Sequence, residues 1–138
     1  MVKSVVTGLV VVHLAATLWH GDAHRALEIG LPFIKNVFVI VVIVAGPVLA
    51  AALIWTRYEI PALWLFTAAM LGALLFGAYH HYVLVSPDNI HHLPPGTAHE
   101  HAAFISSSAA IALVELAAVL YGAFCLGARR GEAGGATD

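Results

Sequence analysis

The sequence has little charge and almost no cysteine. Only 10% of its 138 residues are charged, and the net charge is −2 with the histidines neutral, so there is no basic surface of the kind that binds nucleic acid. The single cysteine, Cys125, excludes an internal disulfide and any metal site built from several thiolates. We expect Cys125 to serve as a small apolar side chain in the interior. Other residue types must therefore supply the chemistry of this chain.

Apolar residues are abundant. They make up 61% of the chain, and the mean hydropathy of +0.90 lies well outside the range of soluble domains. A helix needs about 20 mainly apolar residues to cross about 30 Å of hydrocarbon. Four runs approach this length: 5–19, 33–55, 61–85 and 102–126. Since short connections make neighbouring helices antiparallel, the sequence predicts an all-α, integral membrane, four-helix up-down-up-down bundle over residues 1–130, followed by a flexible tail over 131–138.

The basic residues predict how this bundle lies in the lipid bilayer, because Lys and Arg near span ends are retained on the cytoplasmic side. With both termini cytoplasmic, four basic residues lie inside: Lys3, Arg57, Arg129 and Arg130. Only Arg25 and Lys35 then lie outside. This orientation places every histidine except His13 at or beyond the outer ends of the helices. We therefore expect a histidine-rich outer face.

Several short motifs predict where helices bend or end. The first helix should continue through His24 towards Glu28 and end at Gly30, and Gly46-Pro47 should kink the second helix because proline removes a backbone hydrogen bond. The run Ser86-Pro87-Asp88-Asn89 is typical of a type I turn.

The start of the last helix carries a further signal. Thr97-Ala98-His99-Glu100 fits a capping box, and we favour this role for Glu100 over metal ligation.

Two of the predicted helices carry polar stripes. At 100° per residue, one sector of the first helix holds His13, Thr17, His20, His24 and Glu28, and one sector of the last holds Thr97, His101, Ser108 and Glu115. Ionisable residues at membrane depth face the bundle interior, so the stripes should face each other. His13 and Glu115 would then pair near mid-membrane. Such a pair could only fix the helix register, or it could relay protons or orient a ligand.

Histidines from three helices meet at one membrane level in this arrangement. Neutral imidazole is the commonest nitrogen ligand for zinc, copper and iron, and His20-x3-His24 places two imidazoles on one helix face. His80 and His81 end the third helix and point about 100° apart, so at most one can join the site, and His101 comes from the last helix. The sequence predicts a copper or zinc site, with iron also open, that acts in metal handling or redox chemistry.

Weaker candidates surround these five histidines. Asp22 or Glu28 could add a carboxylate or orient an imidazole, and the loop histidines could fold over the bundle mouth. The full set of weaker candidates is His13, Asp22, Glu28, His91, His92, His99, Glu100 and Glu115.

Other readings of the histidines stay open. A b-type haem electron-transfer subunit would use axial histidines such as His13 or His20 with His80, with Gly72 and Gly77 giving room. A membrane di-metal oxygenase would gather about eight histidines in boxes, of which only the first spacing matches here. The histidines could also be solvated caps on a structural subunit, with another membrane protein or a second copy of the chain as partner.

The stretch Val12-His13-Leu14-Ala15-Ala16-Thr17-Leu18-Trp19-His20-Gly21 resembles the first helix of the copper-resistance D-type membrane proteins. The resemblance covers about ten residues. It implies copper as the metal and carries over His13 as the matching histidine. In this sequence His20 stands where the family pattern has an apolar residue, and Asp22 stands where it has a second glycine.

Overall fold

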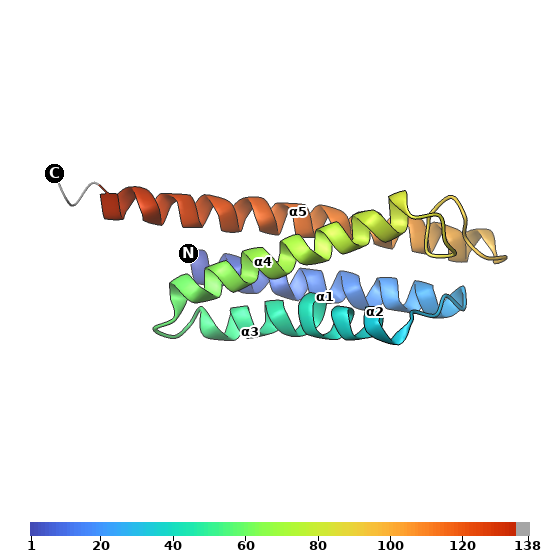
Figure 1. Cartoon of the computed structure of the whole chain (residues 1–138), viewed down its shortest axis with the longest axis horizontal. Helices are drawn as coiled ribbons and strands as arrows, with labels where there is room; N and C mark the ends of the chain where they lie inside the picture. The colour runs from blue at the N-terminus through green and yellow to red at the C-terminus, as the bar shows by residue number, and fades with distance from the viewer. Residues whose placement is uncertain (135–138) are drawn as a thin grey trace.

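Four antiparallel helical spans form the protein in a computed structural model that describes residues 1–134 (Figure 1). The elements are α1 (Val2–Ala26), α2 (Phe33–Phe38), η1 (Val39–Ala45), α3 (Gly46–Leu53), α4 (Glu59–Ala78), η2 (Tyr79–Val83) and α5 (Ala98–Gly134). The segments α2, η1 and α3 are one continuous span, and α4 with η2 is another. Each span is long and apolar enough to cross a membrane. The structure confirms the predicted all-α four-helix membrane bundle.

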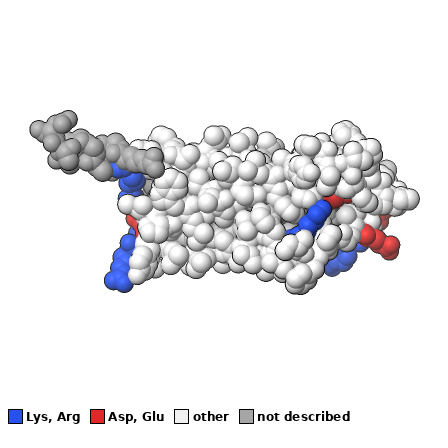
Figure 2. Space-filling view, viewed as in Figure 1, with Lys and Arg blue, Asp and Glu red and all other residues white. Residues whose placement is uncertain are grey.

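The outer surface of the bundle has the distribution of charge expected for a protein in lipid. Figure 2 shows charged side chains at the two ends of the visible face and a broad uncharged band between them. At the end opposite the histidines, Glu59 lies 3.6 Å from Lys3 Nζ and accepts a hydrogen bond from Arg129. Large apolar side chains such as Leu18, Leu75 and others on every span are exposed on the flanks. These flanks are suited to contact with acyl chains.

Close contacts between helices occur in the half of the bundle away from the histidines. Phe66 is fully buried there, and Cys125 is buried beside it in the same core, as predicted. A Cβ atom on Gly122 of α5 would overlap the Thr67 hydroxyl of α4. Small residues allow such close backbone approach between membrane helices.

The end of α1 differs from the prediction. The helix ends at Ala26, and Glu28 takes the left-handed conformation with φ of 54°. The Ile29 N–H donates to His24 O at 2.9 Å and the Glu28 N–H donates to Arg25 O at 3.2 Å, which is the hydrogen-bond pattern of a Schellman motif. The expected stop at Gly30 and the helical placement of Glu28 were therefore wrong. Burial of Leu27 against Ala23 closes the helix earlier.

The second span is irregular before its proline. A π-helix covers Val39–Ala45, and α-helix resumes at Gly46 with Pro47 in its first turn. Proline has no N–H to donate and its ring crowds the preceding turn, so the backbone widens there. A Cβ on Gly46 would lie 3.0 Å from Ala69 Cβ, so this widened stretch runs close to α4.

The last connection contains both predicted motifs. The Asn89 N–H donates to Ser86 O at 3.0 Å, which closes the expected turn. The Thr97 N–H donates to Glu100 Oε2 at 2.7 Å and the Glu100 N–H donates to Thr97 Oγ1 at 3.2 Å, which confirms the capping box.

The last helix extends further than predicted. It continues to Gly134, past the expected start of the tail at residue 131, because one glycine costs a helix only about 1 kcal/mol. The remainder of the predicted tail, 135–138, lies outside the described residues.

Candidate metal centre

Three imidazoles converge at the histidine-rich end of the bundle. α1 supplies His20 and His24, four residues apart on one face, and η2 supplies His81. The Nε2 atom of His20 lies 3.1 Å from Nε2 of His81 and 3.1 Å from Nε2 of His24. His20 and His81 are buried and His24 is half-buried.

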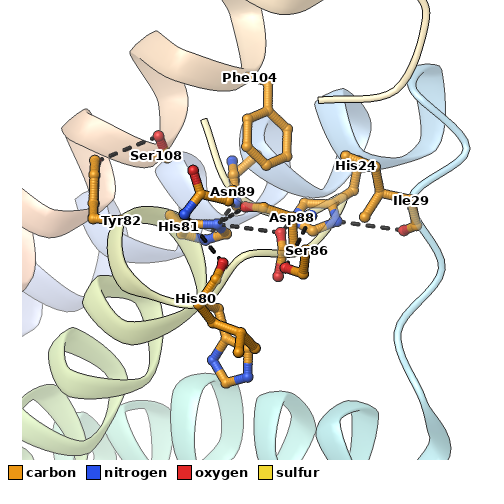
Figure 3. Close-up of polar contacts among 12 residues, drawn as sticks. His24, Ile29, His80, His81, Tyr82, Ser86, Asp88, Asn89, Phe104 and Ser108 are labelled. Carbon is orange, nitrogen blue, oxygen red and sulfur yellow. Dashed lines mark hydrogen bonds and ion pairs between the residues drawn. The ribbon is translucent and has the colours of Figure 1, made fainter. Parts of the chain in front are cut away.

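The other ring nitrogen of each histidine is held by a hydrogen-bond acceptor. His81 Nδ1 lies 2.9 Å from the Asp88 carbonyl oxygen, and His24 Nδ1 lies 3.4 Å from the Ile29 carbonyl oxygen (Figure 3). His20 Nδ1 lies 2.8 Å from Ser107 Oγ. The Ser107 hydroxyl donates to Phe104 O at 3.1 Å, so its oxygen accepts from His20. Since carbonyl oxygens only accept, His81 carries its proton on Nδ1, and the Ser107 contact places that of His20 on Nδ1 as well. His24 can donate either from Nδ1 to Ile29 O or from Nε2 to Asp88 Oδ1, 3.2 Å away.

With His24 also protonated on Nδ1, three Nε2 lone pairs face one another. Two bare lone pairs 3.1 Å apart repel, and a cation between them removes the repulsion. Tetrahedral ligands with metal–nitrogen bonds of 2.0–2.1 Å lie about 3.3 Å from each other. Two of the three separations come close to this spacing, and the ligand atoms of all three histidines lie within 4.8 Å of one another, as a metal site with three histidine ligands and one open position requires.

Asp88 lies beside two of the three imidazoles. The turn after η2 brings its side chain into the bundle mouth, where Oδ1 lies 3.2 Å from His24 Nε2 and 3.2 Å from His81 Nδ1 (Figure 3). Burial by itself would raise the pKa of this carboxyl, but the contacts with His24 and His81 outweigh it and hold the pKa well below its usual range. A negative charge is thus kept next to the cluster, where it favours a bound cation.

An aromatic side chain covers the cluster from α5. Phe104 is fully buried, and its ring centroid lies 4.9 Å from that of His20, 5.1 Å from that of His24 and 5.5 Å from that of His81. The Ile90 N–H in turn donates to the His81 carbonyl at 3.0 Å, so the outer loop ties down the end of η2. Both features restrict the imidazoles to their observed positions.

The remaining predicted ligands lie elsewhere. His80 points away from His81 (Figure 3), with Nδ1 2.8 Å from Phe76 O and its ring against Phe76, as expected for adjacent residues that diverge. His101 donates from Nε2 to Pro94 O at 2.9 Å. The structure therefore brings together three of the five histidines.

The following weaker candidates lie outside the cluster. Asp22 is exposed and lies 3.3 Å from Arg25, and Glu100 is the capping residue. The residues exposed outside the cluster are Glu28, His91, His92 and His99. None of these side chains is part of the three-imidazole group within the described residues.

His13 and Glu115 form the predicted pair deeper in the bundle. His13 Nε2 lies 3.1 Å from Glu115 Oε1, and both side chains are almost completely buried. Together with the contact between His20 and Ser107, this pair confirms that the polar faces of α1 and α5 meet.

Two residues of the site were missed from the sequence. Asp88 was assigned only to a turn, and Ser107 lies one position before Ser108, the residue placed on the stripe. A signal existed for Asp88, because a tight turn only a few residues after His81 must fold back onto the helix end. Ser107 had no such signal, since α1 packs at an angle that only tertiary contacts set.

The positions of the histidines bear on the haem and two-metal alternatives considered above. The axial pairs considered for haem were His13 or His20 with His80. His80 lies against Phe76, with Nδ1 2.8 Å from Phe76 O, whereas His20 lies 3.1 Å from His81. A Cβ on Gly72 would contact Val42 at 3.1 Å, so the expected room there is filled by η1. The described residues contain one such group of three ligands, which suits a single ion.

No family model, curated protein or solved structure matches the chain. What can be stated of its class comes from the fold and the site. It is a four-helix membrane bundle with a buried cluster of three histidines that could hold a metal ion.

Proposed function

We propose that the protein is a membrane metalloprotein that binds one copper or zinc ion through His20, His24 and His81 and acts in metal handling or redox chemistry. One observation carries this proposal: the Nε2 atoms of three imidazoles converge while an acceptor lies next to each Nδ1. Nitrogen ligands without thiolate suit zinc and copper, with iron also accommodated. We place the site on the outer side of the membrane, with both termini in the cytoplasm, from the distribution of basic residues.

The arrangement around the cluster supports a bound ion. Metal-ligating imidazoles commonly donate their second N–H to a carbonyl or carboxylate, which sets the tautomer and the ring orientation. His24 and His81 have a carbonyl oxygen as this partner and His20 has the Ser107 hydroxyl, while Asp88 adds a nearby negative charge. Three protein ligands leave the fourth position free for water or a small molecule, as in catalytic rather than structural zinc sites.

Metal analysis of the purified full-length protein tests this proposal. We expect wild type loaded with Zn²⁺ or Cu²⁺ and desalted to retain about one ion per chain. His81→Ala should lose the ion, since two imidazoles alone hold a metal weakly. His80→Ala is the matched control, because it removes the neighbouring imidazole that points away. Retention should also persist in His101→Ala.

Equal occupancy in wild type and His81→Ala, with unchanged helical content, would overturn the proposal. Loss of the ion from His101→Ala but not from His24→Ala would instead relocate the site towards the start of α5.

A further inference from the structure

A cavity of about 360 Å³ lies next to the three histidines, between α1, the α2–η1 segment, α4 and α5. His20, His24 and His81 border it. Its walls are largely apolar and include Ile43, Ala73, Phe76 and Ile111. An apolar cavity of about 150 Å³ holds a benzene molecule, so this one has room for about two rings. It also lies within the range of known ligand sites.

A polar group lines the deep part of this cavity. Glu115 lies eight residues beyond Ser107 along α5, about 12 Å further from the cluster at 1.5 Å per residue. Its Oε1 contacts His13, while its Oε2 has no hydrogen-bond partner and almost no accessible surface, so a group in the cavity would reach it after a small rotation of the carboxyl group. Buried polar atoms are nearly always hydrogen-bonded, and leaving one unpaired costs about 1–3 kcal/mol. A group inside the cavity could satisfy Oε2.

We propose that the cavity binds an uncharged, membrane-soluble aromatic alcohol of about two rings, with its hydroxyl on Glu115 Oε2. A hydroxyl fits because it both donates and accepts, so it can pair with Oε2 in either protonation state. The ring body would lie between Ala73, Phe76 and Ile111. Acyl lipids are too large for this volume, and a charged ligand would place its charge among the apolar walls between the histidines and Glu115.

The position of the cavity deepens the proposed function, because the far end of the bound molecule would lie beside the open ligand position of the metal. In that respect the inference rests on the proposed function and names its substrate class. Binding in the cavity itself needs only the walls and Glu115. The two proposals can therefore fail separately.

Equilibrium dialysis of radiolabelled 2-naphthol and naphthalene tests the inference, with the full-length protein in lipid nanodiscs and empty nanodiscs subtracted. The two probes share their rings and differ in one hydroxyl. We expect saturable binding of both, with 2-naphthol about tenfold tighter, since one buried hydrogen bond distinguishes them. Glu115→Leu should reduce 2-naphthol to the affinity of naphthalene, and Glu115→Gln should retain most of the difference.

Substitutions that fill the cavity test whether the probes bind inside it. Ala73→Phe should abolish binding of both probes by filling the cavity, whereas Leu75→Phe adds an aromatic ring on the lipid-facing side of the same helix and should change nothing. If Ala73→Phe does not fold, Ile111→Phe fills the cavity from α5. Undiminished binding in the folded filled variant would overturn the inference.

The metal measurements keep the two proposals apart. Each probe is dialysed against protein with and without Zn²⁺. If zinc binds but 2-naphthol does not exceed empty nanodiscs, the cavity inference fails and the proposed function stands. If 2-naphthol binds with the expected preference while zinc does not bind, the proposed function fails and the cavity site stands.

Discussion

At the scale of single residues, the site depends on which nitrogen of each imidazole carries the proton. An acceptor lies within hydrogen-bond distance of each Nδ1: the backbone carbonyls of Ile29 and Asp88 and the hydroxyl of Ser107. The same three side chains with the opposite tautomer would present N–H groups to one another and exclude a cation. The three groups that accept from Nδ1 are therefore as important to the site as the histidines themselves.

Asp88 provides a test of this view. Asp88→Asn keeps the backbone carbonyl that holds His81 but removes the negative charge 3.2 Å from His24 and His81. We expect zinc affinity to fall about 10- to 100-fold, as for other outer-shell changes, measured by competition with a chromophoric chelator. Asp22→Asn is the matched control, because Asp22 is an exposed carboxylate of the same charge on α1. Equal affinity in Asp88→Asn and wild type would contradict an electrostatic role for this side chain.

The pH dependence of metal binding follows from the same residues. Imidazole must be neutral to bind a metal, so protons compete below the usual histidine pKa of about 6.5. The pKa of Asp88 is lowered by His24 and His81, so its carboxylate stays ionised below its usual value of about 3.9 and does not contribute to the loss. We expect zinc occupancy to fall below about pH 6, measured by dialysis and elemental analysis. Unchanged occupancy at pH 5 would argue against imidazole ligands.

At the scale of elements, irregular backbone positions the site. The π-helix η2 ends the third span and directs His81 inwards and His80 away from it (Figure 3). π-segments inside helices are frequent at functional sites, because one extra residue per turn changes the direction of a side chain. The Schellman turn after α1 has a parallel effect, since it returns the Ile29 carbonyl to His24.

The contact between α4 and α5 can be tested independently of the metal. Gly122→Ala places a methyl group against Thr67, which is itself hydrogen-bonded to Leu63 O at 2.7 Å and cannot move freely. We expect a loss of about 1–3 kcal/mol of stability from overpacking, measured as a lowered unfolding temperature in detergent. Gly127→Ala is the control, because a Cβ there meets no other atom within 4 Å. Equal effects of the two substitutions would show that the helices do not approach as described.

At the scale of the whole molecule, the bundle separates two kinds of polar groups. Lys3, Glu59 and Arg129 form ion pairs at one end. The histidine cluster lies near the last turns of α1 and the third span, which Figure 1 shows at the other end of the bundle. An uncharged band lies between them on the visible face (Figure 2). This asymmetry suits a protein whose site is reached from one side of a membrane only.

The predicted orientation can be measured in intact cells. Single cysteines are introduced at two exposed positions in a Cys125→Ser background: His91→Cys on the histidine-rich side and Thr56→Cys in the turn at the other end. We expect a membrane-impermeant maleimide to label His91→Cys only, because the basic residues at the other end favour the cytoplasm. Labelling of Thr56→Cys alone would reverse the orientation, and lysed cells control for reactivity.

The sequence by itself determined the four spans, the capping box and the pairing of His13 with Glu115. These follow from apolar runs, local hydrogen bonding and helical periodicity, which act over a few residues or along one helix. The same arithmetic correctly restricted His80 and His81 to one ligand at most. It could not choose between them, because that choice depends on how η2 winds.

Only the tertiary structure decided the membership of the cluster. His101 shares a helical stripe with Glu115, yet it bonds to Pro94, while Asp88 from a turn lies among the imidazoles. Contacts of this kind depend on helix crossing angles and on where a loop folds back. Those are set by packing between segments far apart in the chain, which periodicity along one helix does not encode.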